Sequence, residues 1–281
     1  MAHEATTQDT WYPDQKTLYV ALELSKENWR LLSSAGGKKK DSGNMSPGSV
    51  LEFNSILERA KRKFGLPEDA RVVSCLEAGR DGFWPHRFMA QQMVEDLVVD
   101  ASSMKVSRQG RRPKNDRIDV GRLLADLVRH DRGDDDVWRV VHVPSAQDEA
   151  DRHAHRELEQ LKKERNQHRN RVRAILATEG VKVTGDLMKS LAKLDQLRTW
   201  NGQSLPAEML WRLERKRARL ELVERHIAEI ARYQAESVKK RATEKMEKIA
   251  KLATLRGVGV RSAWVLVMES LGWRQFRNRK E

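Results

Sequence analysis

Two stretches of similar pattern decide the fold that the sequence predicts: Thr17-Leu-Tyr-Val-Ala-Leu-Glu23 and Arg71-Val-Val-Ser-Cys-Leu-Glu77. Both are short runs rich in strand-forming residues, and each ends in a glutamate. Short apolar runs bounded by polar or turn-forming residues are typical of buried strands. We therefore expect two strands, with the carboxylates of Glu23 and Glu77 at their ends.

The residues between and after these stretches predict an α/β domain. Residues 29–35 are expected to complete a β-hairpin with the first strand, whereas the Gly, Ser and Lys residues of 36–48 predict a loop. Apolar residues at helical spacing predict helices over 50–64, over 83–97 and over 118–128. Because strands and helices alternate, the class is α/β.

From Ser145 onward the sequence predicts long helices instead. Ser145 and Asp148 have the spacing of an N-terminal capping arrangement for the first long helix. In the second helix, Leu213, Leu220 and Ile227 recur every seven residues, which favours a helical hairpin or coiled coil over 146–250. A charged, solvated stalk without chemistry is the simplest interpretation of this region. The apolar positions of the first helix are Leu158, Leu161, Val172, Ile175 and Leu176.

Composition limits the classes of function. The chain has 281 residues and a net charge of +13, so we expect it to bind a polyanion, and nucleic acid is the obvious class. The single cysteine, Cys75, excludes an internal disulfide framework. The longest apolar run, Ala263 to Met268, is far shorter than the roughly 20 residues of a membrane span. We expect a cytoplasmic, nucleoid-associated protein with no membrane partner.

Four carboxylates are the strongest candidates for chemistry. Glu23 and Glu77 end strands, and Asp116 and Asp119 lie three residues apart at the start of a helix, where both can face the same way. Carboxylates that converge from strand ends and a helix can hold two Mg²⁺ ions for phosphodiester chemistry. The alternative is that each is an ordinary strand-end or helix-capping residue.

Basic residues form a second group of candidates. A cationic loop and the first long helix are expected to contact phosphates through charge. Gly257 and Gly259 allow a helix-hairpin-helix, in which backbone N–H groups approach a phosphate, or an ordinary turn. The cations are Lys105, Arg108, Arg111, Arg112 and Lys114 in the loop, and Arg165, Arg169, Arg171 and Arg173 in the helix.

Other reactive side chains offer weaker patterns. His153, His155 and His168 are interpreted as exposed helix residues or minor nucleic-acid contacts. Ser25 and Ser74 have no histidine nearby in the sequence that would reveal a nucleophilic pair. No glycine-rich phosphate loop is present, which argues against ATP-driven chemistry.

Several short motifs, in order, resemble those of the DEDD transposases, which are insertion-sequence recombinases. They are Leu22-Glu-Leu-Ser-Lys26, Leu76-Glu-Ala-Gly79 followed by Phe83-Trp84, Lys114-Asn-Asp-Arg-Ile-Asp119, and Leu255-Arg-Gly-Val-Gly259. A flexible tail is expected over 1–15, and the breakers at 131–136 and Pro144 put the first domain boundary near residue 145. The resemblance implies that 16–145 is a ribonuclease-H-like catalytic domain, similar to Holliday-junction resolvases. It further implies a helical hairpin or coiled coil over 146–250 and the start of an all-α C-terminal module over 251–281.

The same resemblance implies a function. Glu23, Glu77, Asp116 and Asp119 would be a Mg²⁺-binding catalytic tetrad for DNA strand cleavage and transfer. The family has Asp where this chain has Glu23. Its members act on DNA element ends and a target chosen by a structured guide RNA, and the heptad seams here suggest a homo-oligomer.

The resemblance also predicts a truncated product that is unable to complete strand transfer. The family's C-terminal module continues past the point that corresponds to Glu281 and supplies a serine thought to attack DNA. Only ten residues follow Leu271, so the helix is expected to leave an apolar face uncovered. That face carries Ala263, Trp264, Leu266, Val267 and Leu271.

Two other functions stay open. One is a non-catalytic nucleic-acid-binding protein that inhibits a full-length transposase. The other is a stand-alone Holliday-junction resolvase-like nuclease, against which the long helical region argues.

Overall fold

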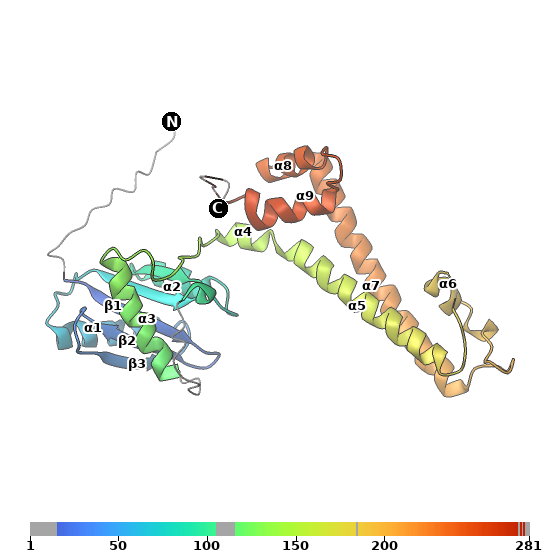
Figure 1. Ribbon diagram of the computed structural model, residues 1–281, viewed down its shortest axis with the longest axis horizontal. Coiled ribbons are helices and arrows are strands. Elements are labelled where there is room, and N and C mark those ends of the chain that lie inside the picture. Colours follow the sequence, from blue (N-terminus) through green and yellow to red (C-terminus); the bar gives the residue numbers. More distant parts are fainter. Residues whose placement is uncertain (1–15, 105–115, 184, 275, 277, 279–281) are drawn as a thin grey trace. The chain divides into compact units, whose positions relative to one another are not determined.

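The computed structural model describes residues 16–104, 116–183, 185–274, 276 and 278. The chain divides into two compact units, with the boundary between Val143 and Pro144 (Figure 1). Each unit has its own apolar clusters. No helix in the described ranges is both long enough and apolar enough to cross a membrane.

The first unit contains a five-stranded mixed sheet in the order β3-β2-β1-β4-β5. The first three strands pair antiparallel, and β1, β4 and β5 run parallel. The strands are β1 (Leu18–Leu24), β2 (Trp29–Ser34), β3 (Asp41–Met45), β4 (Val72–Glu77) and β5 (Glu95–Val99).

The predicted hairpin is confirmed, but the predicted loop over 36–48 is wrong. β3 occupies Asp41–Met45 and pairs with β2 at the edge of the sheet. Its sequence, Asp-Ser-Gly-Asn-Met, lacks strand-forming residues, so strand propensity does not predict this strand. Gly43 brings the strand close to helix α1 (Val50–Phe64), because a Cβ there would lie 2.9 Å from the side chain of Ile56.

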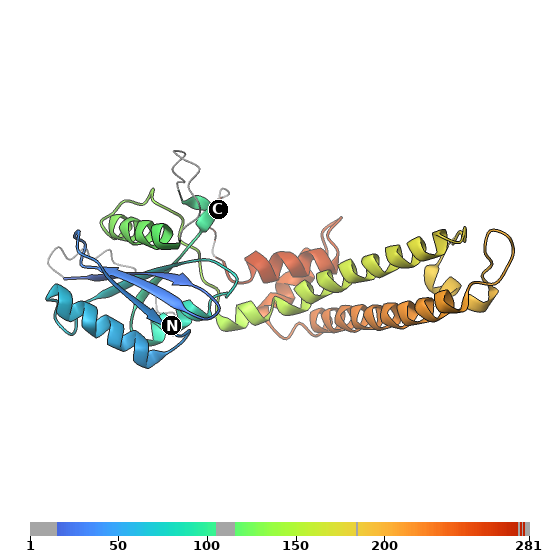
Figure 2. The same cartoon turned by 90° about the horizontal axis from the view of Figure 1, so that it is seen from below.

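Helices cover both faces of the sheet. Helices α1 and α2 (Trp84–Gln91) pack on one face through residues such as Phe53 and Phe88, and α3 (Asp116–Asp131) packs on the other through Leu124 (Figure 2). The predicted helix over 83–97 is too long. It ends at Gln91, the chain turns through a positive φ at Met93, and β5 begins at Glu95.

Helix α3 runs antiparallel to β1 and β4. Its last residue, Asp131, accepts hydrogen bonds from the hydroxyl of Tyr19, at the start of β1, and from the guanidinium of Arg71, just before β4. The C-terminal end of α3 therefore lies at the amino-terminal edge of the parallel strands. Its first turn consequently points toward their carboxyl-terminal edge.

The second unit is helical. Helices α5 and α7 form an antiparallel hairpin, in which Arg165 pairs with Glu224 and the predicted apolar positions of α5 are buried. The capping box of Ser145 and Asp148 is confirmed, although the helix that it starts is the short α4 rather than the long α5. The helices are α4 (Ala146–Ala150), α5 (His153–Ala177), α6 (Leu187–Leu191), α7 (Ala207–Lys240), α8 (Glu244–Leu252) and α9 (Val260–Leu266), with a π-helical turn at Val267–Leu271 and short 3₁₀ turns at Ala101–Ser103 and Leu194–Gln196.

The expectation of an uncovered apolar face near the C-terminus is wrong for most of its residues. Ala263, Trp264 and Val267 are buried against Ile249 of α8 and Val238 of α7. Leu266 and Leu271 stay partly exposed. The face is covered because α8 folds back beside α9, which the local sequence pattern does not reveal.

Candidate functional site

Glu23 and Glu77 lie next to each other at the carboxyl-terminal edge of the sheet. The parallel register pairs Leu22 of β1 with Leu76 of β4, so the two glutamates occupy the following positions on adjacent strands. Side chains alternate along a strand, which puts both glutamates on the face that carries Ala21 and Cys75. That face is the one covered by α3. Glu23 is half-buried, and Glu77 is exposed.

The first turn of α3 lies toward the same edge. Asp116 begins this helix and Asp119 lies in its first turn, but the side chains of both are outside the part of the chain that the structure describes. The backbone thus brings β1, β4 and the start of α3, which carry the four predicted residues, to one edge and one face of the sheet. The side-chain geometry of the complete tetrad stays a prediction.

The donor chemistry at this edge suits a hard divalent cation. Glu23 and Glu77 supply carboxylate oxygens, the ligands that Mg²⁺ prefers. Within the described ranges, no group of three or more His, Cys, Asp or Glu side chains is placed to hold a metal ion. Two carboxylates alone do not complete a site, so a metal centre here requires the aspartates of α3.

The predicted phosphate contacts fall into two groups. The loop residues Lys105, Arg108, Arg111, Arg112 and Lys114 lie outside the described residues. On α5, Arg171 and Arg173 are exposed, whereas Arg165 and Arg169 are half-buried. Arg165 is also paired with Glu224 at 3.8 Å, which makes it less available to a phosphate.

The glycines of the predicted helix-hairpin-helix lie between α8 and α9. Gly257 has φ of +86°, a conformation that other residues rarely adopt, and Gly259 is the N-cap of α9. No atom among the described residues lies within 4 Å of a Cβ built on either glycine, so the turn is open on the outside. This geometry fits both an ordinary turn and a backbone that approaches a phosphate.

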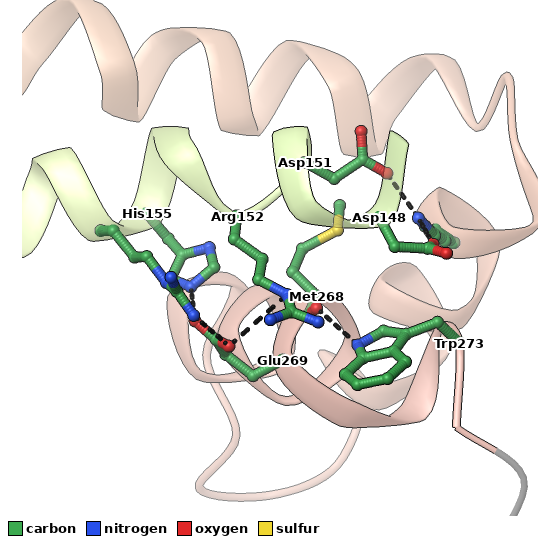
Figure 3. A network of polar contacts seen from close by, with 9 residues as sticks. Asp148, Asp151, Arg152, His155, Met268, Glu269 and Trp273 are labelled. Atoms are coloured by element: carbon green, nitrogen blue, oxygen red, sulfur yellow. Dashed lines mark hydrogen bonds and ion pairs between the residues drawn. The ribbon is translucent and has the colours of Figure 1, made fainter. Parts of the chain in front are cut away.

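His153 is exposed, as predicted for the histidines of α5, but the other two differ from the prediction. His155 and His168 are buried, at 4% and 7% exposed. Nε2 of His155 lies 2.6 Å from a carboxylate oxygen of Glu269, which also accepts hydrogen bonds from the guanidinium of Arg156 (Figure 3). His168 pairs with Glu164 one turn earlier. The error arises because Glu269 is distant in sequence, so no local pattern signals that His155 has a partner.

Glu269 is the centre of a polar cluster that joins α5 to the segment after α9. Hydrogen bonding to Arg156 lowers the pKa of Glu269 to about 2, and His155 adds to this effect, although burial acts in the opposite direction. Beside it, the guanidinium of Arg152 lies 4.5 Å from the ring centre of Trp273. These contacts are structural, because each charged group has its partner within the protein.

A second buried network was missed in the sequence. The Ser74 hydroxyl donates to Asp96, whose other oxygen lies 2.9 Å from Nδ1 of His86. The Asp96 side chain is fully buried. Since the carboxylate stands between the serine and the histidine, the hydroxyl contacts Asp96 and not the imidazole, and the arrangement differs from a nucleophilic triad. It ties α2 to β4 and β5 beside a cavity of about 410 Å³.

Taken together, the fold and the acidic edge define a two-unit protein with an α/β domain that presents carboxylates and a basic helical unit. The chain is 32% identical over 285 aligned residues to a protein of Sinorhizobium fredii named "Putative transposase y4rJ". The alignment covers 95% of this chain and 70% of that protein. The chain therefore belongs to this family of transposases. No protein-family model matches it.

Proposed function

We propose that this chain is the transposase of an insertion sequence and that its first unit is a ribonuclease-H-like domain for DNA strand cleavage and transfer. Glu23, Glu77, Asp116 and Asp119 would form its acidic site. The observation that carries the proposal is the placement of Glu23 and Glu77 in adjacent register, on the face covered by α3. Membership of a transposase family supports DNA as the substrate.

The sheet supports the proposed fold. Three antiparallel strands are followed by two parallel ones in the order β3-β2-β1-β4-β5, and helices pack on both faces. This arrangement puts the central strands β1 and β4 side by side, so that their last residues share one edge. The antiparallel direction of α3 then brings Asp116 and Asp119 toward that edge.

The four carboxylates would hold Mg²⁺, which supplies an activated oxygen nucleophile and stabilises the leaving oxygen in phosphodiester cleavage. Glu23 has one methylene more than aspartate, and its half-buried position on β1 limits where its oxygens can reach. The basic segment 105–114 comes shortly before α3 in the sequence, and we propose that it holds the DNA backbone near the acidic edge. A guide RNA and a second copy of the chain are further proposed partners.

The test is a cleavage and joining assay with the purified chain, labelled element-end DNA, a target duplex, the element's RNA and Mg²⁺. Asp119→Asn is expected to abolish cleavage, since one lost carboxylate removes a metal ligand, while binding of the DNA persists. Asp135→Asn is the matched control, because Asp135 is an exposed acid of the same unit away from the proposed tetrad. Loss of activity in both variants would contradict the proposed site.

The same assay separates the other two functions. DNA binding without cleavage in the parent protein, with and without Mg²⁺, would favour a binding protein that inhibits a full-length transposase. Cleavage of four-way junctions without RNA or element sequence would favour a resolvase-like nuclease. Strand joining that depends on Asp119 would exclude both.

A further inference from the structure

A cluster of cations surrounds Lys216 near the end of the helical hairpin that is remote from α8 and α9. Arg212, Arg215 and Arg219 come from α7, and Arg171 comes from the neighbouring α5. All four arginines are exposed. Burial lowers the pKa of Lys216, and the charges of the four arginines lower it further. The positive charges are thus close enough to repel one another.

These cations differ from other arginines of the hairpin. Arg165 and Arg217 pair with glutamates across or along the helices. Within the part of the chain that the structure describes, neither Lys216 nor any of the four arginines around it has a carboxylate within ion-pair distance. Crowding unpaired cations costs free energy, which a bound polyanion would recover.

The cluster borders a groove between α5 and α7, which we name the distal groove. It has a volume of about 610 Å³. Two carboxylates, Glu179 and Glu208, also line it, and they offset only part of the positive charge of the cluster. Its lining residues include Arg171, Arg212 and Lys216 together with the apolar Ile175, Pro206 and Met209.

Two exposed tryptophans belong to the same end of the helical hairpin as the groove, although neither lines it. Trp211 is 64% exposed, and the guanidinium of Arg215 lies 3.6 Å from the centre of its ring. Trp200 is 79% exposed, and its backbone N–H donates to the carbonyl of Glu179, which lines the groove. Exposed aromatic rings next to unpaired arginines offer surfaces on which unpaired bases stack.

We propose that the distal groove binds single-stranded nucleic acid. The arginines and Lys216 would contact successive phosphates, and Trp211 and Trp200 would stack on bases. A duplex has its bases already stacked and offers only phosphates. It would therefore contact the cations but not the tryptophan rings. The inference does not depend on the proposed metal chemistry, because phosphate contacts and stacking need no Mg²⁺.

The experiment measures binding of the full chain, in EDTA, to labelled oligonucleotides of one sequence: single-stranded DNA, single-stranded RNA and duplex DNA. Arg212→Glu with Arg219→Glu is expected to weaken single-strand binding at least about tenfold and to reduce the salt dependence by about two phosphate contacts. The relative loss for DNA and for RNA shows which strand the groove prefers.

The matched control is Arg225→Glu with Arg232→Glu. These exposed arginines lie on the same helix, each about 20 Å from its counterpart in the groove variant, and the change in net charge is identical. The control is expected to change binding less than about threefold. Equal losses in the two double variants would mean that overall charge alone attracts the nucleic acid, and the proposal would be overturned.

Stacking has a separate test. Trp211→Leu is expected to weaken single-strand binding about fivefold or more, whereas Trp211→Phe keeps an aromatic face and stays within about twofold of the parent. Equal behaviour of the Leu and Phe variants would overturn the stacking role. Tighter binding of the duplex, or equal displacement by polyglutamate, would overturn the assignment to single strands. Far-ultraviolet circular dichroism checks that each variant keeps its helices.

Discussion

Nε2 of His155 lies 2.6 Å from Oε1 of Glu269, although the two residues are far apart in the sequence. The contact joins the start of α5 to the turn that follows α9, and Arg156 binds the same carboxylate at 2.9 Å. Because Glu269 is 31% exposed, water screens part of this attraction. The contact nevertheless makes the stability of the second unit depend on pH.

Acid is expected to weaken the contacts of Glu269 with His155 and Arg156, because it protonates the carboxylate. The pKa of Glu269 is lowered from 4.5 to about 2, so its contribution to stability is complete above pH 4.5 and is lost as the pH falls from 4.5 to about 2. Glu269→Gln should lower the free energy of unfolding by about 1–2 kcal/mol near neutral pH. Urea unfolding at several pH values checks this. The difference between parent and variant should shrink toward pH 2, and a constant difference would contradict the assignment.

Trp264 is expected to hold α8 and α9 together. It is 1% exposed and packs edge-on against Tyr233 of α7, with 6.2 Å between ring centres. Trp264→Ala should cost about 3–5 kcal/mol in the free energy of unfolding of the second unit, because it leaves a large cavity. Leu266→Ala, on the exposed side of the same helix, should cost less than about 1 kcal/mol. Similar losses at both positions would mean that the face is not buried as described.

The edge strand β3 depends on a residue without a side chain. Gly43→Ala would put a Cβ 2.9 Å from Cδ1 of Ile56, which is buried and has little room to move. We expect a loss of about 1–3 kcal/mol in the free energy of unfolding. Gly37→Ala, where a Cβ meets no described atom within 4 Å, should change it by less than about 0.5 kcal/mol. Thermal unfolding of the two variants provides the comparison.

The pKa of the Tyr19 phenol depends on the position of the C-terminal end of α3. Burial, together with the hydrogen bond and negative charge of Asp131, raises its pKa to about 12. Since this pKa lies above the ordinary value of 10, the phenol stabilises the fold below pH 10, and that stability is lost between pH 10 and 12. Asp131→Asn should lower the pKa of Tyr19, but not fully to 10, because burial persists.

Near-ultraviolet absorbance of the phenolate measures this titration, and Tyr19→Phe identifies the signal. An unchanged Tyr19 pKa in Asp131→Asn would show that the end of α3 does not contact β1. Asp116 and Asp119 would then not be expected to lie toward Glu23 and Glu77.

Much of the first unit follows from local pattern. The runs that end in Glu23 and Glu77 form strands, and the apolar spacing of 50–64 forms α1 between its caps Ser49 and Gly65. The edge strand β3 does not follow, because pairing with β2 overrides its weak propensity. The buried Asp96 does not follow either, since its partners Ser74 and His86 come from other elements.

The sequence alone determined β1, β2 and β4 and the long helices, and it put Glu23 and Glu77 near the ends of the two central strands, because periodicity and composition act between neighbouring residues. It did not reveal β3 or the start of β5. Tertiary structure decided which distant groups meet: Glu23 beside Glu77, Asp131 against Tyr19, and Glu269 against His155. It also brought four arginines close to Lys216. Such contacts depend on the packing of whole elements, and packing depends on surfaces that no local run of residues specifies.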